Sequence, residues 1–298
     1  MSDPLQVSNM DEDGPARKPR IGLMGEFSAG KSTLLNMLLT GDPLPVKVTA
    51  TNAPPVWISH GSDAAVRVLV DGTEETIDPG DLESIGLQGT KFVRLYMQSD
   101  ALEICDLIDM PGISDPNMSS DVWKQVFDEV DCVIWCTHAT QAWRQSEAAV
   151  WAEIEGQTNG NNILVVTQFD KIKTERDRAR LIARVKKETN GLFEDVFPLA
   201  LMDAINASNE ETWKDSGAAA FSDFLVEMLL RREEKSSAPI DVAARAMGSD
   251  QGATQICKRN PAPGEDSDKK VVPRRVRLHP GRERTNRNQP EHTAPPIF

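Results

Sequence analysis

Short runs of apolar residues recur along the chain and alternate with stretches whose apolar residues are spaced as on one face of a helix. Continuous apolar runs bounded by turn residues are typical of buried strands, and the longer periodic stretches are typical of amphipathic helices. The alternation of the two predicts an α/β fold built largely from parallel strands.

The pattern predicts the following elements. Strands are expected over 20–24, 53–59, 65–70, 74–77, 91–97, 102–108, 132–137 and 162–166, and a last strand is expected within 194–201. Helices are expected over 33–40, 121–130, 146–156, 175–190 and 218–234. The alternation on both sides of Asp71-Gly72 predicts an antiparallel hairpin within this otherwise parallel arrangement.

Outside residues 20–234 the periodicity is absent, which predicts one folded domain between two tails. Residues 1–19 are polar and acidic, and residues 235–298 are rich in Pro, Arg, Asn and Gly, so both are predicted to be disordered. The net charge of −13 is uneven, because the chain from Cys257 onward carries ten Lys and Arg against five Asp and Glu. The basic tail is either a solvated segment or a contact for anionic lipid or RNA.

Composition narrows the class of protein. No apolar run approaches the ~18 residues of a membrane span, and the acidic start does not resemble a signal peptide. Cys132 and Cys136 lie in one predicted strand, about 13 Å apart, which is too far for a disulfide, so core cysteines in a reducing cytosol are expected. The acidic body argues against a specific nucleic-acid partner. A cytoplasmic protein is predicted, with peripheral contact at the inner membrane face as an alternative location.

The residues 25–32 read G-x-x-x-x-G-K-S between a predicted strand and a predicted helix, which is the context that a P-loop requires. Gly25 and Gly30 let the backbone N–H groups converge on an anion, at the positive end of the following helix. Lys31 reaches the β- and γ-phosphates, and the Ser32 hydroxyl binds Mg²⁺. The alternative is a coincidental glycine-rich turn. The phosphate-binding residues predicted here are Gly25, Ser28, Ala29, Gly30, Lys31, Ser32 and Thr33.

Residues 42–51, rich in Pro, Val and Thr, follow the P-loop helix. An NTPase that senses the γ-phosphate needs a mobile segment here whose hydroxyl joins the Mg²⁺ shell. Thr51 is the first candidate and Thr49 the second, and an ordinary connection containing a threonine is the alternative.

Asp109-Met110-Pro111-Gly112 follows the strand predicted over 102–108. The Asp109 carboxylate is placed to hold the Mg²⁺ water shell, and the Gly112 N–H to meet the γ-phosphate. A plain turn is the alternative. The metal ligands predicted from the sequence are Ser32, Thr51 and Asp109.

Thr167-Gln168-Phe169-Asp170-Lys171 follows the strand predicted over 162–166. An aspartate at this place accepts the N1–H and N2–H groups of guanine, whereas adenine would leave it unpaired. The usual form of this segment has lysine where Gln168 stands, so ATP is an alternative nucleotide, and a simple helix cap by Asp170 is an alternative role. The predicted base-contacting residues are Thr167, Gln168, Asp170, Lys171, Ala200 and Leu201.

The ordered set of these motifs resembles the GTPase domain of the dynamin superfamily, bacterial dynamin-like proteins above all. The resemblance is carried by residues 26–36, by Leu44-Pro45 with Thr51-Asn52, and by the Asp109 and Thr167 segments, and it covers about residues 20–234. It implies a three-layer P-loop NTPase domain with a mixed, mostly parallel sheet. It also implies GTP with Mg²⁺, and slow hydrolysis that rises when two G domains meet.

The attacking water needs a partner that the segment after Asp109 does not provide. Ras-type enzymes orient the water with a Gln after D-x-x-G, but here Ile113 follows and cannot form a hydrogen bond. The resemblance implies that Ser28, Thr51 and a monovalent cation position the water, with Lys31 on the phosphates. Phe27 stands where eukaryotic dynamins carry Gln.

Dynamins continue from the G domain into a long helical stalk, and no such pattern follows Glu234. The sequence is therefore expected to be either a short protein or a truncated or frame-altered gene product. Two functions are expected: a GTPase that works as a transient homodimer or beside a stalk-bearing partner, or a non-hydrolytic switch or assembly factor. Intact Lys31, Ser32 and Asp109 favour the first.

Overall fold

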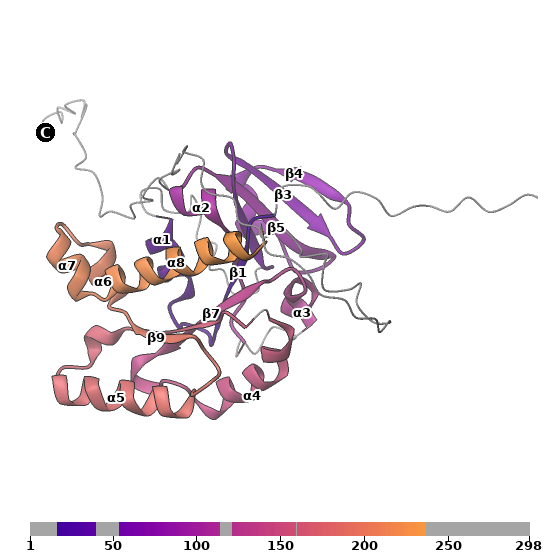
Figure 1. The fold of residues 1–298 in the computed structure, drawn as a ribbon. Helices are drawn as coiled ribbons and strands as arrows, with labels where there is room; N and C mark the ends of the chain where they lie inside the picture. Colours follow the sequence, from indigo (N-terminus) through magenta and orange to yellow (C-terminus); the bar gives the residue numbers. More distant parts are fainter. Residues whose placement is uncertain (1–16, 40–53, 114–120, 159, 237–298) are drawn as a thin grey trace, which may run out of the picture.

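The computed structural model describes residues 17–39, 54–113, 121–158 and 160–236. Within this part of the chain a nine-stranded sheet runs through the centre of the molecule, in the order β4-β3-β5-β2-β6-β1-β7-β8-β9 (Figure 1). The strands are β1 (Arg20–Gly25), β2 (Val56–His60), β3 (Ala64–Leu69), β4 (Glu74–Ile77), β5 (Thr90–Met97), β6 (Asp106–Asp109), β7 (Cys132–His138), β8 (Ile163–Thr167) and β9 (Asp195–Pro198).

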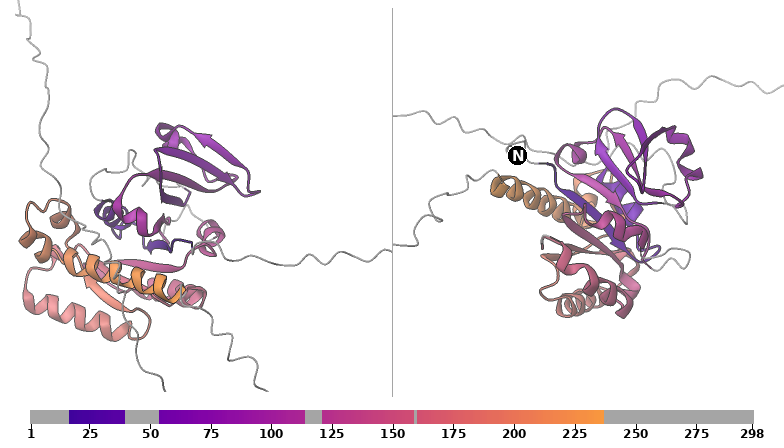
Figure 2. Two further views of the ribbon diagram at one scale, coloured as in Figure 1. Left: turned by 45° about the horizontal axis from the view of Figure 1, so that its top comes forward. Right: turned by 90° about the vertical axis from the view of Figure 1, so that its right-hand side faces the viewer.

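The sheet has a parallel half and a mixed half. In the parallel half, β6, β1, β7, β8 and β9 are parallel to one another. Strand β2 is antiparallel to β6 and parallel to β5, and β3 is antiparallel to both β4 and β5. The strands β3 to β5 lie at the opposite end of the molecule from helix α5 (Figure 2).

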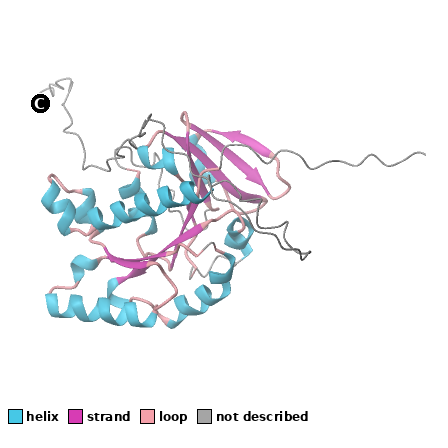
Figure 3. Cartoon of the chain, in the orientation of Figure 1, coloured by secondary structure: helices cyan, strands magenta, loops and turns pink. Residues whose placement is uncertain are grey.

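Helices cover both faces of the sheet (Figure 3). They are α1 (Lys31–Leu38), α2 (Asp100–Ile104), α3 (Asp121–Phe127), α4 (Gln145–Ile154), α5 (Glu175–Glu188), α6 (Leu201–Ile205), α7 (Glu210–Asp215) and α8 (Ala218–Ser236). Short 3₁₀ turns occupy Pro79–Ser84, Ala139–Gln141, Glu155–Gln157 and Phe169–Lys171. Among the described residues no helix combines the length and apolarity of a membrane span.

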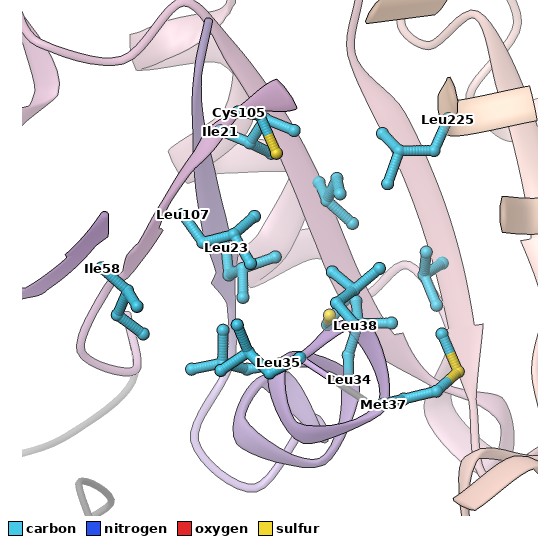
Figure 4. Packing of buried hydrophobic residues seen from close by; sticks show 14 of the residues in the cluster. Ile21, Leu23, Leu34, Leu35, Met37, Leu38, Ile58, Cys105, Leu107 and Leu225 are labelled. Carbon is cyan, nitrogen blue, oxygen red and sulfur yellow. The ribbon is translucent and has the colours of Figure 1, made fainter. Parts of the chain in front are cut away.

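Alternate residues of each central strand belong to two separate hydrophobic cores, because successive side chains of a strand point to opposite faces of the sheet. In β1, Leu23 joins the cluster under α1, α6, α7 and α8, whereas Met24 joins the cluster under α3, α4 and α5. Figure 4 shows the first cluster, in which Leu34, Leu35 and Leu38 of α1 lie against side chains of the sheet. The predicted three-layer α/β fold with a mixed, mostly parallel sheet is thereby confirmed.

Tryptophans dominate the second core beneath α4. Trp135 of β7 is fully buried and meets Trp143 and Trp151 edge to face, with ring centroids 6.1 and 5.7 Å apart. Trp143 also meets Phe193 at 5.4 Å. Trp143 has a φ of +58°, which is unusual for a residue with a side chain, so its surroundings hold this backbone in place.

Most predicted elements are present, and the exceptions are short. The strand predicted over 102–108 is wrong in its first half, because Asp100–Ile104 forms helix α2 and β6 begins only at Asp106. Helices α6 and α7 were not predicted at all. The buried cysteines are confirmed, since Cys105, Cys132 and Cys136 are free and buried. Nearly all of the predicted tails lies outside the described residues, and the domain boundaries at 19 and 234 stay predictions.

Candidate functional site

The predicted nucleotide-binding segments converge at one edge of the sheet. Strands β6, β1, β7 and β8 are parallel neighbours, so their carboxyl ends lie side by side. Asp109, Gly25 and Thr167 stand at three of these ends. Ligands of open α/β sheets bind outside the carboxyl ends of the strands, and the three separate motifs therefore form one candidate site.

The P-loop, residues 25–32, needs glycine where the chain passes close to β7. A Cβ atom on Gly25 would lie 2.1 Å from the carbonyl oxygen of Cys136, and Gly25 has a φ of +140°. Gly30, with a φ of +91°, directly precedes α1. The loop between them exposes Ser28, whose φ is +60°, at the tip. The two glycines of the predicted phosphate-binding turn thus both have a positive φ, and the phosphate-binding role of the turn stays a prediction.

The Lys31 side chain lies folded within the loop. Its Nζ donates hydrogen bonds to the carbonyl oxygens of Gly25 at 3.2 Å and Glu26 at 2.9 Å. Burial lowers the pKa of Lys31, while the negative charge of Asp109 opposes this shift. The ammonium is thus held at the P-loop, where phosphate oxygens would compete for it.

Asp109, at the end of β6, is 8% exposed and lacks one hydrogen bond. Its Oδ1 atom has no partner among the described residues, and its carboxylate interacts with the Ser32 hydroxyl and the Lys31 charge. Burial raises the pKa of Asp109 to about 6, although Lys31 and Ser32 oppose the shift. A buried carboxylate oxygen without a partner is costly, and a bound cation would supply one.

The Ser32 hydroxyl and the Asp109 carboxylate are two oxygen ligands that suit a Mg²⁺ ion bound to phosphate at the same time. In the described ranges no cluster of three or more His, Cys, Asp or Glu side chains could hold a metal alone. Protein sites commonly hold Mg²⁺ through one or two oxygen ligands, completed by water and substrate phosphates. Ser32 and Asp109 fit that arrangement, and Thr51 and Thr49 lie outside the described residues.

The Asp109 segment continues along the P-loop. The N–H of Ile113 donates to the Gly25 carbonyl at 3.2 Å, and a Cβ on Gly112 would lie 2.9 Å from Cα of Phe27. Gly112 therefore lies directly beside the tip of the P-loop, as its predicted γ-phosphate contact requires. Ile113 packs against the second core, so its side chain gives the site nothing polar.

The base-reading segment is hydrogen-bonded to the P-loop by Thr167. Its hydroxyl donates to the carbonyl oxygens of Ala29 at 2.7 Å and Thr137 at 3.3 Å. Gln168 follows with a φ of +53°, and its Oε1 accepts a hydrogen bond from Lys171 Nζ. Asp170 is half-buried in the 3₁₀ turn Phe169–Lys171.

The predicted final contact loop lies next to this turn, since the N–H of Phe169 donates to the Leu199 carbonyl at 3.2 Å. Ala200 and Leu201 are both buried, and Leu201 is the first residue of α6 and joins the first core. Their side chains belong to the interior, so only their backbone is available to a base.

One contact of the site was not predicted. The Glu26 carboxylate, inside the P-loop, accepts hydrogen bonds from Arg144 and Ser146 at the start of α4. More than a hundred residues separate the partners, so no spacing rule joins them. The sequence signal that points to such a contact is chemical, because an acidic residue within an anion-binding loop requires a compensating partner.

Comparison with known proteins assigns the chain to a family. Residues 21–169 match the model of the Dynamin family. Dynamin-like protein 2 of Campylobacter jejuni subsp. jejuni serotype O:23/36 (strain 81-176) is 24% identical over 218 residues, which are 70% of this chain and 34% of the relative. GTPase Era of Aquifex aeolicus (strain VF5) is 26% identical over 193 residues, 62% of this chain and 52% of Era.

A solved structure supports the same fold. It belongs to an oligomerised bacterial dynamin pair, described as a mechanism for the long-range sensing and tethering of membranes. The TM-score is 0.53 at 23% identity, over 74% of this chain and 37% of that one. The chain thus spans from about a third to about a half of the length of these relatives. Since the matched residues 21–169 amount to half of the chain and include the P-loop and the Asp109 segment, the chain belongs to the dynamin family.

Proposed function

We propose that this protein binds GTP and hydrolyses it to GDP and phosphate with Mg²⁺. The observation that carries the proposal is the buried Asp109 carboxylate, whose Oδ1 has no partner among the described residues, beside Ser32 and Lys31 of a P-loop. Membership of the dynamin family and the similarity to GTPase Era support it.

Each residue of the site has a role in this proposal. Lys31 leaves the P-loop carbonyls to bind the β- and γ-phosphates, and the backbone of residues 25–33 surrounds them. Ser32 and Asp109 hold Mg²⁺, which neutralises phosphate charge when bound. Gly112 donates its N–H to the γ-phosphate, and Ser28, whose side chain is exposed, orients the attacking water.

Thr51 completes the proposed hydrolytic site, together with a monovalent cation. We propose that Thr51 joins the Mg²⁺ shell and the attacking water only when GTP is bound. The variant Thr51→Ala would then retain GDP binding and lose hydrolysis, because it lacks a contact specific to the GTP state.

Asp170 is the proposed reader of the guanine base, with Thr167, Gln168, Lys171 and the backbone of Ala200 and Leu201 around it. Gln168 accepts a hydrogen bond from the ammonium of Lys171. A positive charge therefore lies next to position 168, which is usually a lysine in this segment. Competition between GTP, ATP and XTP for binding tests the choice of base. ATP binding equal to GTP binding would contradict the role of Asp170.

We further propose that hydrolysis rises when two G domains meet, or when a stalk-bearing partner aligns them at a membrane. The oligomerised bacterial dynamin pair supports an assembly of this kind. Turnover per molecule measured from nanomolar to high micromolar protein tests it. A rising turnover supports dimer stimulation, whereas GTP binding without turnover at any concentration would support a non-hydrolytic switch instead.

The decisive test of the function is Lys31→Ala in the full chain. Loss of the ammonium leaves phosphate charge uncompensated, so GTP affinity should fall by at least about a hundredfold. Thermal unfolding should show that the fold is kept. Lys214→Ala is the matched control, because Lys214 pairs with Glu210 on the exposed surface of α7. Near-normal GTP affinity of Lys31→Ala would refute the P-loop assignment.

A further inference from the structure

Glu26 places a negative charge inside the loop that is proposed to bind a polyphosphate. It directly follows Gly25, and its side chain is 15% exposed. A carboxylate and a phosphate a few ångströms apart repel each other strongly when water is excluded. The chain therefore needs a feature that neutralises Glu26 and fixes its position.

Arg144 and Ser146 provide that feature. Arg144 donates from its guanidinium to Glu26 Oε2 at 3.1 Å, and Ser146 donates from its hydroxyl to Glu26 Oε1 at 2.6 Å. Both carboxylate oxygens are thereby engaged, one by a charge of opposite sign. Ser146 lies in the first turn of α4, where the helix dipole also favours a negative charge. We call Glu26, Arg144 and Ser146 the clasp.

The side of the clasp that belongs to α4 is fixed by the second core. Glu147 is buried, and it accepts hydrogen bonds from the Trp135 indole at 3.0 Å, the Thr137 hydroxyl at 2.9 Å and the Arg144 N–H at 2.9 Å. The Thr137 hydroxyl in turn accepts the N–H of Trp143 at 2.9 Å. The backbone of Arg144 is therefore held in place, and its side chain reaches Glu26 from a fixed position.

The other side of the clasp is the P-loop itself. The carbonyl oxygen of Glu26 accepts hydrogen bonds from Lys31 Nζ at 2.9 Å and from the Ala29 N–H at 3.2 Å. The same residue thus joins the connection between β7 and α4 to the phosphate-binding lysine.

We propose that the clasp is a positioning device that makes an acidic P-loop compatible with a polyphosphate ligand, an inference that rests on the proposed function. Arg144 neutralises Glu26 and, with Ser146, holds its carboxylate at the start of α4. Without Arg144 the carboxylate keeps only the Ser146 hydrogen bond, and its charge near the bound phosphates is no longer neutralised. Glu26, Arg144 and Ser146 act through the loop and are not catalytic residues.

The test is a cycle of variants in the full chain, read by equilibrium binding of fluorescent GTP and GDP. Arg144→Ala should weaken GTP binding by about tenfold and GDP binding by about threefold, since the extra phosphate charge of GTP increases the repulsion. Glu26→Gln leaves the Arg144 guanidinium without its counter-charge, so this variant should bind neither nucleotide more weakly than the wild type does. The double variant Glu26→Gln with Arg144→Ala should recover GTP affinity to within about threefold of the wild type.

Arg67→Ala and Glu75→Gln are the matched controls. This arginine–glutamate pair joins β3 to β4 at 3.3 Å, far from the P-loop in sequence, and its loss should leave nucleotide affinity unchanged. Thermal unfolding of each variant separates a general loss of stability from the effect of charge.

Rescue is the readout that a purely structural role would not give. If Glu26→Gln fails to restore GTP affinity to Arg144→Ala, or if GTP and GDP weaken equally, the clasp is refuted. Binding of inorganic triphosphate is measured in parallel, and it tests the charge argument without a base. The chain could bind inorganic triphosphate, with affinity that depends on Arg144 and Glu26 as described, and yet not bind GTP. That result would overturn only the proposed function.

Discussion

The Thr167 hydroxyl donates a hydrogen bond to the Ala29 carbonyl over 2.7 Å, which joins the end of β8 directly to the P-loop. Thr167 is fully buried, and the same hydroxyl approaches the Thr137 carbonyl of β7 at 3.3 Å. The segment assigned to the base and the loop assigned to the phosphates are therefore one hydrogen-bonded unit.

Thr167→Val should weaken that unit. Valine has nearly the shape of threonine but cannot donate, so the Ala29 carbonyl loses its partner, at a cost of about 1–3 kcal/mol in the free energy of unfolding. GDP should also dissociate faster, because the loop is less fixed. Urea unfolding and stopped-flow release of fluorescent GDP measure the two effects. Thr167→Ser keeps the hydroxyl and should behave closer to the wild type, and equal behaviour of the two variants would contradict this role.

Gly25→Ala should destabilise the protein severely. The added Cβ would lie 2.1 Å from the Cys136 carbonyl oxygen, so β1 and β7 must separate locally. We expect a loss of about 3 kcal/mol or more, as for overpacked core sites. Gly72→Ala is the control, because it shares a positive φ but meets nothing within 4 Å, and it should lose about 1 kcal/mol from strain alone. Equal denaturant midpoints for the two variants would show that the clash expected at Gly25 is relieved without a loss of stability.

Asp170→Asn should change the preferred nucleotide from GTP to XTP. Xanthine offers an acceptor where guanine offers its N2 donor, and the amide of asparagine can donate to it. We expect GTP affinity to fall by about a hundredfold and XTP affinity to rise. Competition binding measures both. Asp203→Asn, at an exposed position of α6, is the control. Unchanged GTP binding by Asp170→Asn would show that another residue reads the base.

Glu147 should give the stability a distinct dependence on pH. Burial raises the pKa of Glu147 above its ordinary value of 4.5, and hydrogen bonds from Arg144, Trp135 and Thr137 only partly oppose it. The folded protein therefore binds this proton more tightly than the unfolded chain. The contribution of Glu147 is full below pH 4.5 and is lost as the pH rises through the folded-state pKa.

The free energies of unfolding of the wild type and Glu147→Gln test this sign. Glutamine cannot accept all three hydrogen bonds, so the variant should be less stable throughout. Its deficit should be largest below pH 4.5 and should shrink as the pH rises through the folded-state pKa of Glu147, because burial of the charged carboxylate then costs the wild type stability. A deficit that grows with pH would mean that Glu147 is ionised without penalty.

Local patterns of apolar and polar residues predict those segments of the candidate site that directly follow a strand. The P-loop, the Asp109 segment and the Thr167 segment each begin where a buried apolar run ends, and the structure brings all three to one edge. Their chemical roles stay predictions, and so does the role of Thr51, which lies outside the described residues.

Short elements and distant contacts could not be predicted. Leu102 and Ile104 alternate with polar residues as in a strand, but they belong to a five-residue helix that is too short to show helical periodicity. The contact of Glu26 with Arg144 depends on where the connection after β7 turns. That turn is set by Trp143 and its tertiary surroundings, and no local rule gives it.

The three indoles beneath α4 have an optical consequence. Trp143 directly precedes Arg144, and it lies edge to face with Trp135, which also meets Trp151. Indoles fixed at such short range and in such angles couple their electronic transitions, which gives a near-ultraviolet circular dichroism band that depends on this geometry. Three of the six tryptophans of the chain thus form an intrinsic chromophore behind the P-loop. Any movement of the connection between β7 and α4 during a nucleotide cycle would be recorded in that band without an attached dye.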